Sequence, residues 1–98
     1  MIFPIQLKSG SRIFHMWCEL TETGQTFEKF TLWPRDNPYK TIVLQNNRPL
    51  IRKKLKLKTK PYSWKVMSGK IRDQRALDET IAVIEKYIEE NLRYRNTK

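Results

Sequence analysis

The spacing of apolar residues changes near Asp73, and this change is the strongest constraint on the fold. Beyond Asp73, apolar residues recur every three or four positions, which is the period of an amphipathic helix. They are Leu77, Ile81, Ile84, Ile88 and Leu92. Asp73 itself is a residue type suited to cap a helix N-terminus. The sequence therefore predicts one helix over 73–95, long enough to cross a small sheet.

The first 67 residues show a different pattern, with short runs rich in β-branched and aromatic residues separated by turn residues. Strands are expected at 2–8, 12–20, 27–33, 39–45, 50–59 and 62–67. Pro4 favours an edge position for the first of them, because proline cannot donate to a neighbouring strand. Strands followed by one long helix are typical of an α+β domain. We expect residues 1–98 to form a single domain, an antiparallel β-sheet of five or six short strands with one C-terminal helix packed on one face.

Charge is unevenly distributed along the chain. The 98 residues hold 20 Lys and Arg against 10 Asp and Glu, a formal net charge of +10. Residues 40–72 contain eleven of the basic residues and no acidic residue, whereas the stretches on either side are close to neutral. Solubility alone does not require this segregation. A basic segment of this kind favours a polyanionic partner.

The densest part of this segment, residues 50–60, alternates in the manner of a strand. Ile51, Leu55 and Leu57 would face the core, and cations would occupy the other face. Those cations are Arg52, Lys54, Lys56, Lys58 and Lys60. Such a row would bind a phosphate backbone and release its condensed counterions. Two alternatives are that the lysines protect an edge strand from aggregation, or that acidic residues of the helix neutralise them.

Aromatic residues supply a second kind of contact. If the helix covers Phe14 and Met16, then His15 and Trp17 lie on the open face of the sheet. Bases of a single strand stack on such aromatics while cations pair with the phosphates. The alternative is burial, because tryptophan side chains more often lie in the core. The predicted nucleic-acid-binding residues are Trp17, Arg48, Arg52, Lys54, Lys56, Lys58, Lys60, Trp64, Lys65, Lys70 and Arg72.

Catalytic and metal-binding patterns are not found in the sequence. His15 and Cys18 are three residues apart on an expected strand, so they point to opposite faces and cannot form a nucleophile–base pair. One His and one Cys make no metal-ligand cluster, and no glycine-rich phosphate loop is present. The prediction is a non-enzymatic protein without metal or cofactor. A small ribonuclease of a toxin kind is the enzymatic alternative.

The remaining features concern location and partners. A lone cysteine cannot make an internal disulfide, and the first ten residues do not resemble a signal peptide or a membrane span, so a cytoplasmic protein without membrane contact is expected. The helix stripe nearly follows a heptad, which leaves a homodimer through the C-terminal helix or a sheet edge open. The sequence predicts binding to single-stranded or structured DNA or RNA with little sequence preference. The main alternative is a protein-interaction module that docks an acidic partner.

Overall fold

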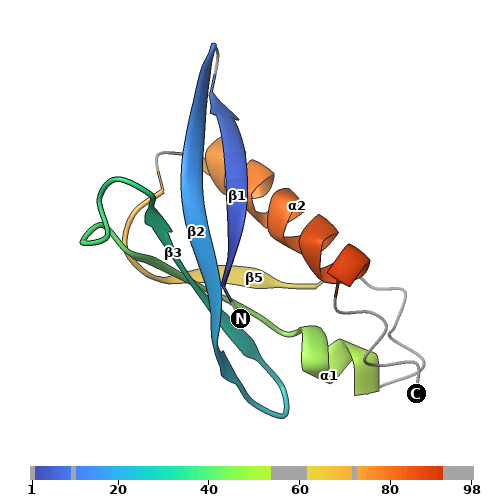
Figure 1. Ribbon diagram of the computed structural model, residues 1–98. Helices are drawn as coiled ribbons and strands as arrows, with labels where there is room; N and C mark the ends of the chain where they lie inside the picture. The colour runs from blue at the N-terminus through green and yellow to red at the C-terminus, as the bar shows by residue number, and fades with distance from the viewer. Residues whose placement is uncertain (1, 10, 54–61, 72, 92–98) are drawn as a thin grey trace.

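The protein folds as one antiparallel sheet with a long helix on one face (Figure 1). The computed structural model describes residues 2–9, 11–53, 62–71 and 73–91. The sheet order follows the sequence, and the strands are β1 (Ile2–Ser9), β2 (Arg12–Thr23), β3 (Glu28–Pro34), β4 (Ile42–Asn46) and β5 (Trp64–Ser68). Helix α1 (Arg48–Lys53) lies between β4 and β5, and helix α2 (Gln74–Asn91) follows β5. The predicted α+β class with a C-terminal helix is confirmed.

Helix α2 is held to the sheet by a compact apolar seam. Ile84 and Ile88 are buried, as predicted, whereas Ile81 is half-buried. Ile84 and Ile88 pack in one cluster with Phe3, Ile5, Cys18, Phe30, Leu32 and Leu44. Tyr87 stacks on Phe3 with ring centroids 3.7 Å apart. Each fully buried aliphatic side chain contributes about 1.5–3 kcal/mol, so this seam is the main source of stability in the described chain.

The start of α2 follows from its capping residue. The Ala76 backbone N–H donates to Asp73 Oδ1 at 2.8 Å, and the Leu77 N–H donates to the Asp73 carbonyl at 3.1 Å. Asp73 therefore satisfies one of the free donors of the first turn, as its residue type predicts.

Alternation along β2 separates the two faces of the sheet. Cys18 is fully buried under α2, and Met16 and Leu20 pack at the margin of the same core. Phe14 has the same parity but lies toward the end of the strand and is 45% exposed. Trp17 has the opposite parity, so its side chain lies on the face away from α2, here called the open face. The predicted assignment of the two faces of β2 is confirmed.

Strand β1 forms one edge of the sheet, as Pro4 predicts. Proline has no N–H to offer to another strand. Farther along β1, the Lys8 backbone N–H donates to Glu79 Oε1 of α2 at 2.8 Å. This edge is therefore partly closed to pairing with another chain.

The predicted strand over 50–59 is wrong where the structure describes it. Residues 50–53 belong to α1, and residues 54–59 lie outside the described part of the chain. The Arg48 N–H donates to Asn46 Oδ1 at 2.9 Å, and the Ile51 N–H donates to the Asn47 carbonyl at 3.1 Å. Pro49 falls in the first turn, where its missing N–H costs little. The sequence Asn-Asn-Arg-Pro thus starts a helix, although it also fits a turn.

Candidate nucleic-acid interface

Two tryptophans lie side by side on the open face. Trp17 of β2 and Trp33 of β3 are register partners, and both side chains are half-buried. The guanidinium carbon of Arg35 lies 5.1 Å from the centroid of the Trp17 ring. Trp17 was predicted for this face. Trp33 was expected to share a face with Phe27 and Lys29 but was not among the predicted binding residues, because its pairing with Trp17 depends on the β2–β3 register rather than on local sequence.

Cations flank this tryptophan pair at both ends of β3. Lys29, Thr31, Trp33 and Arg35 alternate along the strand and just beyond it, so they belong to the same face. The strand rise separates Lys29 from Arg35 by about 20 Å. Lys65 of β5 joins the Lys29 end of this row, because the register pairs Lys29 with Gln45 and Gln45 with Lys65. Lys65 is exposed, as its predicted role requires.

Two acidic residues moderate the charge of the open face. Lys29 Nζ lies 3.5 Å from Glu22 Oε1, and both side chains are substantially exposed. An exposed pair of this kind contributes only about 0–1 kcal/mol and leaves the lysine able to exchange partners. Glu19 has the parity of Trp17 and is half-buried. The cations of the open face are therefore partly balanced, chiefly at the Lys29 end.

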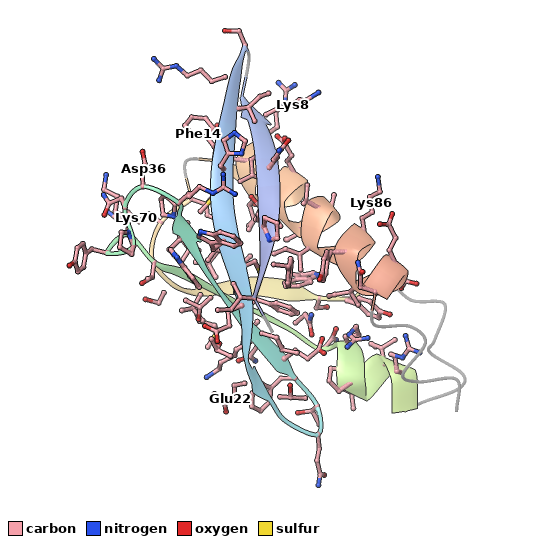
Figure 2. The ribbon with its side chains drawn as sticks, viewed as in Figure 1. Lys8, Phe14, Glu22, Asp36, Lys70 and Lys86 are labelled. Atoms are coloured by element: carbon pink, nitrogen blue, oxygen red, sulfur yellow. The ribbon has the colours of Figure 1, made fainter. Side chains whose placement is uncertain are left out.

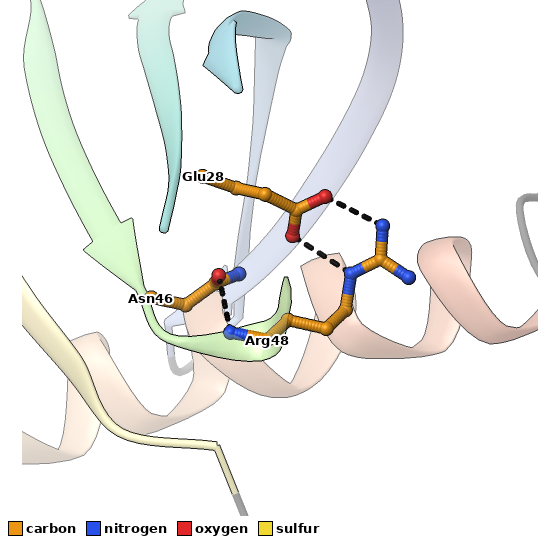
Figure 3. A network of polar contacts seen from close by, with 3 residues as sticks. All are labelled: Glu28, Asn46 and Arg48. Carbon is orange, nitrogen blue, oxygen red and sulfur yellow. Dashed lines mark hydrogen bonds and ion pairs between the residues drawn. The ribbon is translucent and has the colours of Figure 1, made fainter. Parts of the chain in front are cut away.

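Arg48 does not fit the predicted role of a phosphate contact. It is 8% exposed and makes a two-pronged ion pair with Glu28, with Nε–Oε1 at 2.7 Å and Nη2–Oε2 at 2.5 Å (Figure 3). Burial alone would lower the pKa of Arg48, but hydrogen bonding and charge attraction from Glu28 raise it above its usual value. The Arg48 charge is neutralised inside the protein and ties α1 to β3.

Trp64 does not lie on the open face, where a base-stacking role would require it. Its side chain is on the α2 side of the sheet, packed against Phe30 with ring centroids 5.7 Å apart. The indole Nε1–H donates to Glu85 Oε2 of α2 at 2.8 Å. Trp64 therefore ties β5 to the helix, and both its ring and its polar edge have partners within the fold.

Of the other predicted cations, the structure describes Lys70 and Arg52. Lys70 is exposed after β5, and Arg52 is half-buried in α1. The remaining five, all outside the described residues, are Lys54, Lys56, Lys58, Lys60 and Arg72.

Four of these cations lie in the sequence between Asn47 and Ser63, two described residues that hydrogen-bond to each other. The Asn47 N–H donates to the Ser63 carbonyl at 3.2 Å, and the Ser63 N–H donates to Asn47 Oδ1 at 2.8 Å. These two bonds extend the pairing of Asn46 with Trp64 at the ends of β4 and β5. The chain between Asn47 and Ser63, residues 48–62, begins with α1 and is here called the lysine loop; it contains Arg48, Arg52, Lys53, Lys54, Lys56, Lys58 and Lys60.

His15 and Cys18 lie as their spacing predicts. His15 is exposed on the open face, whereas Cys18 is fully buried on the other. Burial raises the pKa of the Cys18 thiol to about 12, and the Glu19 carboxylate acts in the same direction. Such a thiol is a poor nucleophile at neutral pH. Within the described ranges, no cluster of three metal-ligating side chains is found, and no helix is long and apolar enough to span a membrane.

Comparison with known proteins adds no relative. No protein-family model matches the chain, and neither a curated protein nor a solved structure matches it.

Proposed function

We propose that the protein binds single-stranded nucleic acid across the open face of its sheet. The observation that carries this proposal is the tryptophan pair, Trp17 and Trp33, with cations on both sides of it. Bases would stack on the indole rings, and phosphates would pair with Lys29, Lys65 and Arg35. A base stacked on Trp17 would take the place of the Arg35 guanidinium, which would turn to a phosphate.

A single strand fits this face better than a duplex. The bases of a duplex are stacked on each other, so the two indoles would find no free base to bind. A single strand offers its bases and its phosphates together. Every base has a π-face, and lysine is a point charge without directional readout, so we expect little sequence preference.

The lysine loop supplies additional charge for the same ligand. Its base is at Asn47 and Ser63, directly beside the start of β5 and two residues from Lys65. Lys54, Lys56, Lys58 and Lys60 would extend phosphate contacts beyond the Lys29–Lys65 end of the open face. Their expected contribution is electrostatic, and therefore independent of sequence and strongly dependent on salt.

Fluorescence anisotropy with labelled oligonucleotides tests this function. The ligands are a single-stranded DNA and a single-stranded RNA of about 20 nucleotides and a duplex of the same length, at about 50 and about 200 mM salt. We expect both single strands to bind at least about tenfold more tightly than the duplex, with affinity falling steeply as salt rises. Equal affinity for the duplex, or affinity independent of salt, would contradict the proposal.

A further inference from the structure

Glu19 is a half-buried carboxylate beside the tryptophan pair, and none of the proposed stacking or phosphate contacts uses it. It lies two residues from Trp17 along β2, so both side chains belong to the open face. Its register partner on β3 is Thr31, which is two residues from Trp33. Arg35 follows Trp33 in the other direction along the chain. Glu19 therefore borders the two indoles on the side opposite to Arg35.

Within the described part of the chain, the Glu19 carboxylate has no partner. The ion pairs found there join Lys29 to Glu22 and Arg48 to Glu28, and no side-chain hydrogen bond involves Glu19. A carboxylate that loses part of its hydration without gaining a partner lowers the stability of the fold. Both oxygens of Glu19 are available to accept hydrogen bonds from a ligand.

Charges on the two sides of Trp17 orient a nucleotide that stacks on its ring. On one side, the Arg35 N–H donates to the His15 carbonyl, and the Arg35 guanidinium carbon lies 5.1 Å from the ring centroid. Glu19 lies on the other side. A phosphate is attracted by the guanidinium and repelled by the carboxylate. The phosphate of the stacked nucleotide should therefore lie toward Arg35, and an edge of its base toward Glu19.

A carboxylate at the edge of a base discriminates among the bases. An ionised carboxylate accepts hydrogen bonds and donates none. Guanine presents two adjacent donors, N1–H and the N2 amino group, which match the two oxygens of one carboxylate. In adenine and cytosine the amino group lies beside an acceptor ring nitrogen, and in thymine and uracil N3–H lies between two carbonyl acceptors. These four bases would place an acceptor against a carboxylate oxygen, whereas guanine satisfies both oxygens.

We propose that Glu19 makes the base position at Trp17 selective for guanine, through hydrogen bonds from N1–H and the N2 amino group to the carboxylate. This inference rests on the proposed single-strand binding and refines it at one position, because the other stacking and phosphate contacts remain indifferent to sequence. The ligand is a single strand that contains guanine. The guanine edge is the same in DNA and in RNA, so this contact does not distinguish them.

Labelled DNA strands of about 12 thymines with one variable central base test this inference on the unaltered protein. The central base is guanine, hypoxanthine, adenine or thymine, and affinity is measured by fluorescence anisotropy. We expect the guanine strand to bind about fivefold or more tightly than the adenine strand, because charge-assisted hydrogen bonds are gained by a purine ring of the same size. Hypoxanthine keeps the N1–H of guanine but lacks the N2 amino group, so its strand should have an intermediate affinity.

Glu19→Gln and Glu22→Gln assign the preference to one side chain, because each removes one negative charge from the open face. Glu22 lies toward the opposite end of β2 from Phe14 (Figure 2), and its carboxylate pairs with Lys29 at 3.5 Å. Glu19→Gln should reduce the guanine preference to about twofold or less, since an amide offers one acceptor oxygen in place of two. Glu22→Gln should keep the preference and tighten all four strands by a similar factor, since it removes a carboxylate that repels phosphates. Thermal melting followed by circular dichroism checks that both variants stay folded.

The inference is overturned if the guanine and adenine strands bind the unaltered protein equally, or if the hypoxanthine strand binds as tightly as the guanine strand. It is also overturned if Glu19→Gln keeps the preference, or if Glu22→Gln loses it to the same extent. The hypoxanthine comparison uses the unaltered protein, so it decides even where a variant fails to fold. A protein that binds the thymine strand without preferring guanine keeps the proposed function and loses only this inference. Failure of the proposed function is different, because none of the four strands would then bind.

Discussion

Trp17 and Trp33 are direct register partners on the open face, and this pairing depends on two strands that are connected by a short turn. The bulge between Leu20 and Glu22 lies between that turn and the two tryptophans, and its one-residue shift of the register brings Trp17 opposite Trp33. Helix α2 occupies the other face, so the indoles are held by the sheet without being enclosed by the core. This arrangement combines a rigid support with exposed aromatic surface, as base stacking requires.

The α2 seam should dominate the free energy of unfolding. Ile84 is fully buried against the sheet, so Ile84→Ala should destabilise the protein by about 2–5 kcal/mol. Lys86→Ala, an exposed position on the same helix, should change stability by less than about 0.5 kcal/mol. Urea unfolding followed by circular dichroism measures both. Equal stability of the two variants would mean that α2 does not cover the core.

Removing one partner of the Glu28–Arg48 pair should destabilise the protein strongly, whereas replacing both partners by apolar residues should destabilise it less. Arg48→Met leaves the Glu28 carboxylate buried without a partner, and we expect a loss of about 3–5 kcal/mol. Arg48 Nη1 and Asn46 Nδ2 have no hydrogen-bond partner among the described residues, which lowers the net gain from the intact cluster. Glu28→Leu combined with Arg48→Met should therefore be more stable than Arg48→Met alone. A double variant no more stable than Arg48→Met would contradict the cost assigned to the unpaired Glu28 carboxylate.

Cys18 should make stability depend on pH in the alkaline range. The folded-state pKa is about 12, raised by burial from the ordinary value of 9.0, so the unfolded chain loses the thiol proton first. Stability should be unaffected by this group below about pH 8 and should fall between about pH 9 and about pH 12, by at most about 1.4 kcal/mol per pH unit. Unfolding of the unaltered protein and of Cys18→Ala across this range isolates the effect. Identical slopes would contradict it.

The lysine loop should contribute through charge alone. Lys54→Glu with Lys56→Glu should weaken binding to all single strands by a similar factor, and the slope of log affinity against log salt should become shallower by about 0.7 for each phosphate that no longer pairs with a lysine. Arg75→Glu with Lys86→Glu carries the same charge change on α2 and serves as the control. Anisotropy titrations at several salt concentrations measure both. An equal weakening in the control would show that only total charge matters.

Sequence periodicity predicted most of the fold because the relevant patterns are local. The helical stripe after Asp73 predicted α2, and alternation along β2 predicted that Cys18 and Trp17 lie on opposite faces. Lys65 was likewise predicted and lies exposed at one end of the open face. These assignments depend only on period and on turn residues, both of which are visible within a window of about ten residues.

The wrong predictions concern residues whose structure depends on long-range contacts. The alternation that predicted a strand over 50–59 lies mainly in residues 54–58, whereas residues 50–53 belong to α1. Helix α1 is stabilised by Asn46 at its start and by the Arg48 ion pair with Glu28, twenty residues away. Trp64 was predicted for the nucleic-acid surface, yet it hydrogen-bonds Glu85 on the helix side. Alternation places the adjacent residues Trp64 and Lys65 on opposite faces, and the pairing of Trp64 with the buried Asn46 of β4 decides that Trp64 is the one that faces α2.

The most direct measurement is the affinity of a single-stranded oligonucleotide for Trp17→Ala and Trp33→Ala, with Tyr39→Ala as control. Tyr39 is 92% exposed on the β3–β4 connection, so its removal deletes an exposed aromatic ring without touching the open face. Each tryptophan variant should stay folded and bind more weakly by about 1–3 kcal/mol, with the salt dependence of the unaltered protein, because a stacking ring is removed while every phosphate-binding cation remains. Tyr39→Ala should bind normally. Folded tryptophan variants that bind as tightly as the unaltered protein would contradict base stacking on the open face.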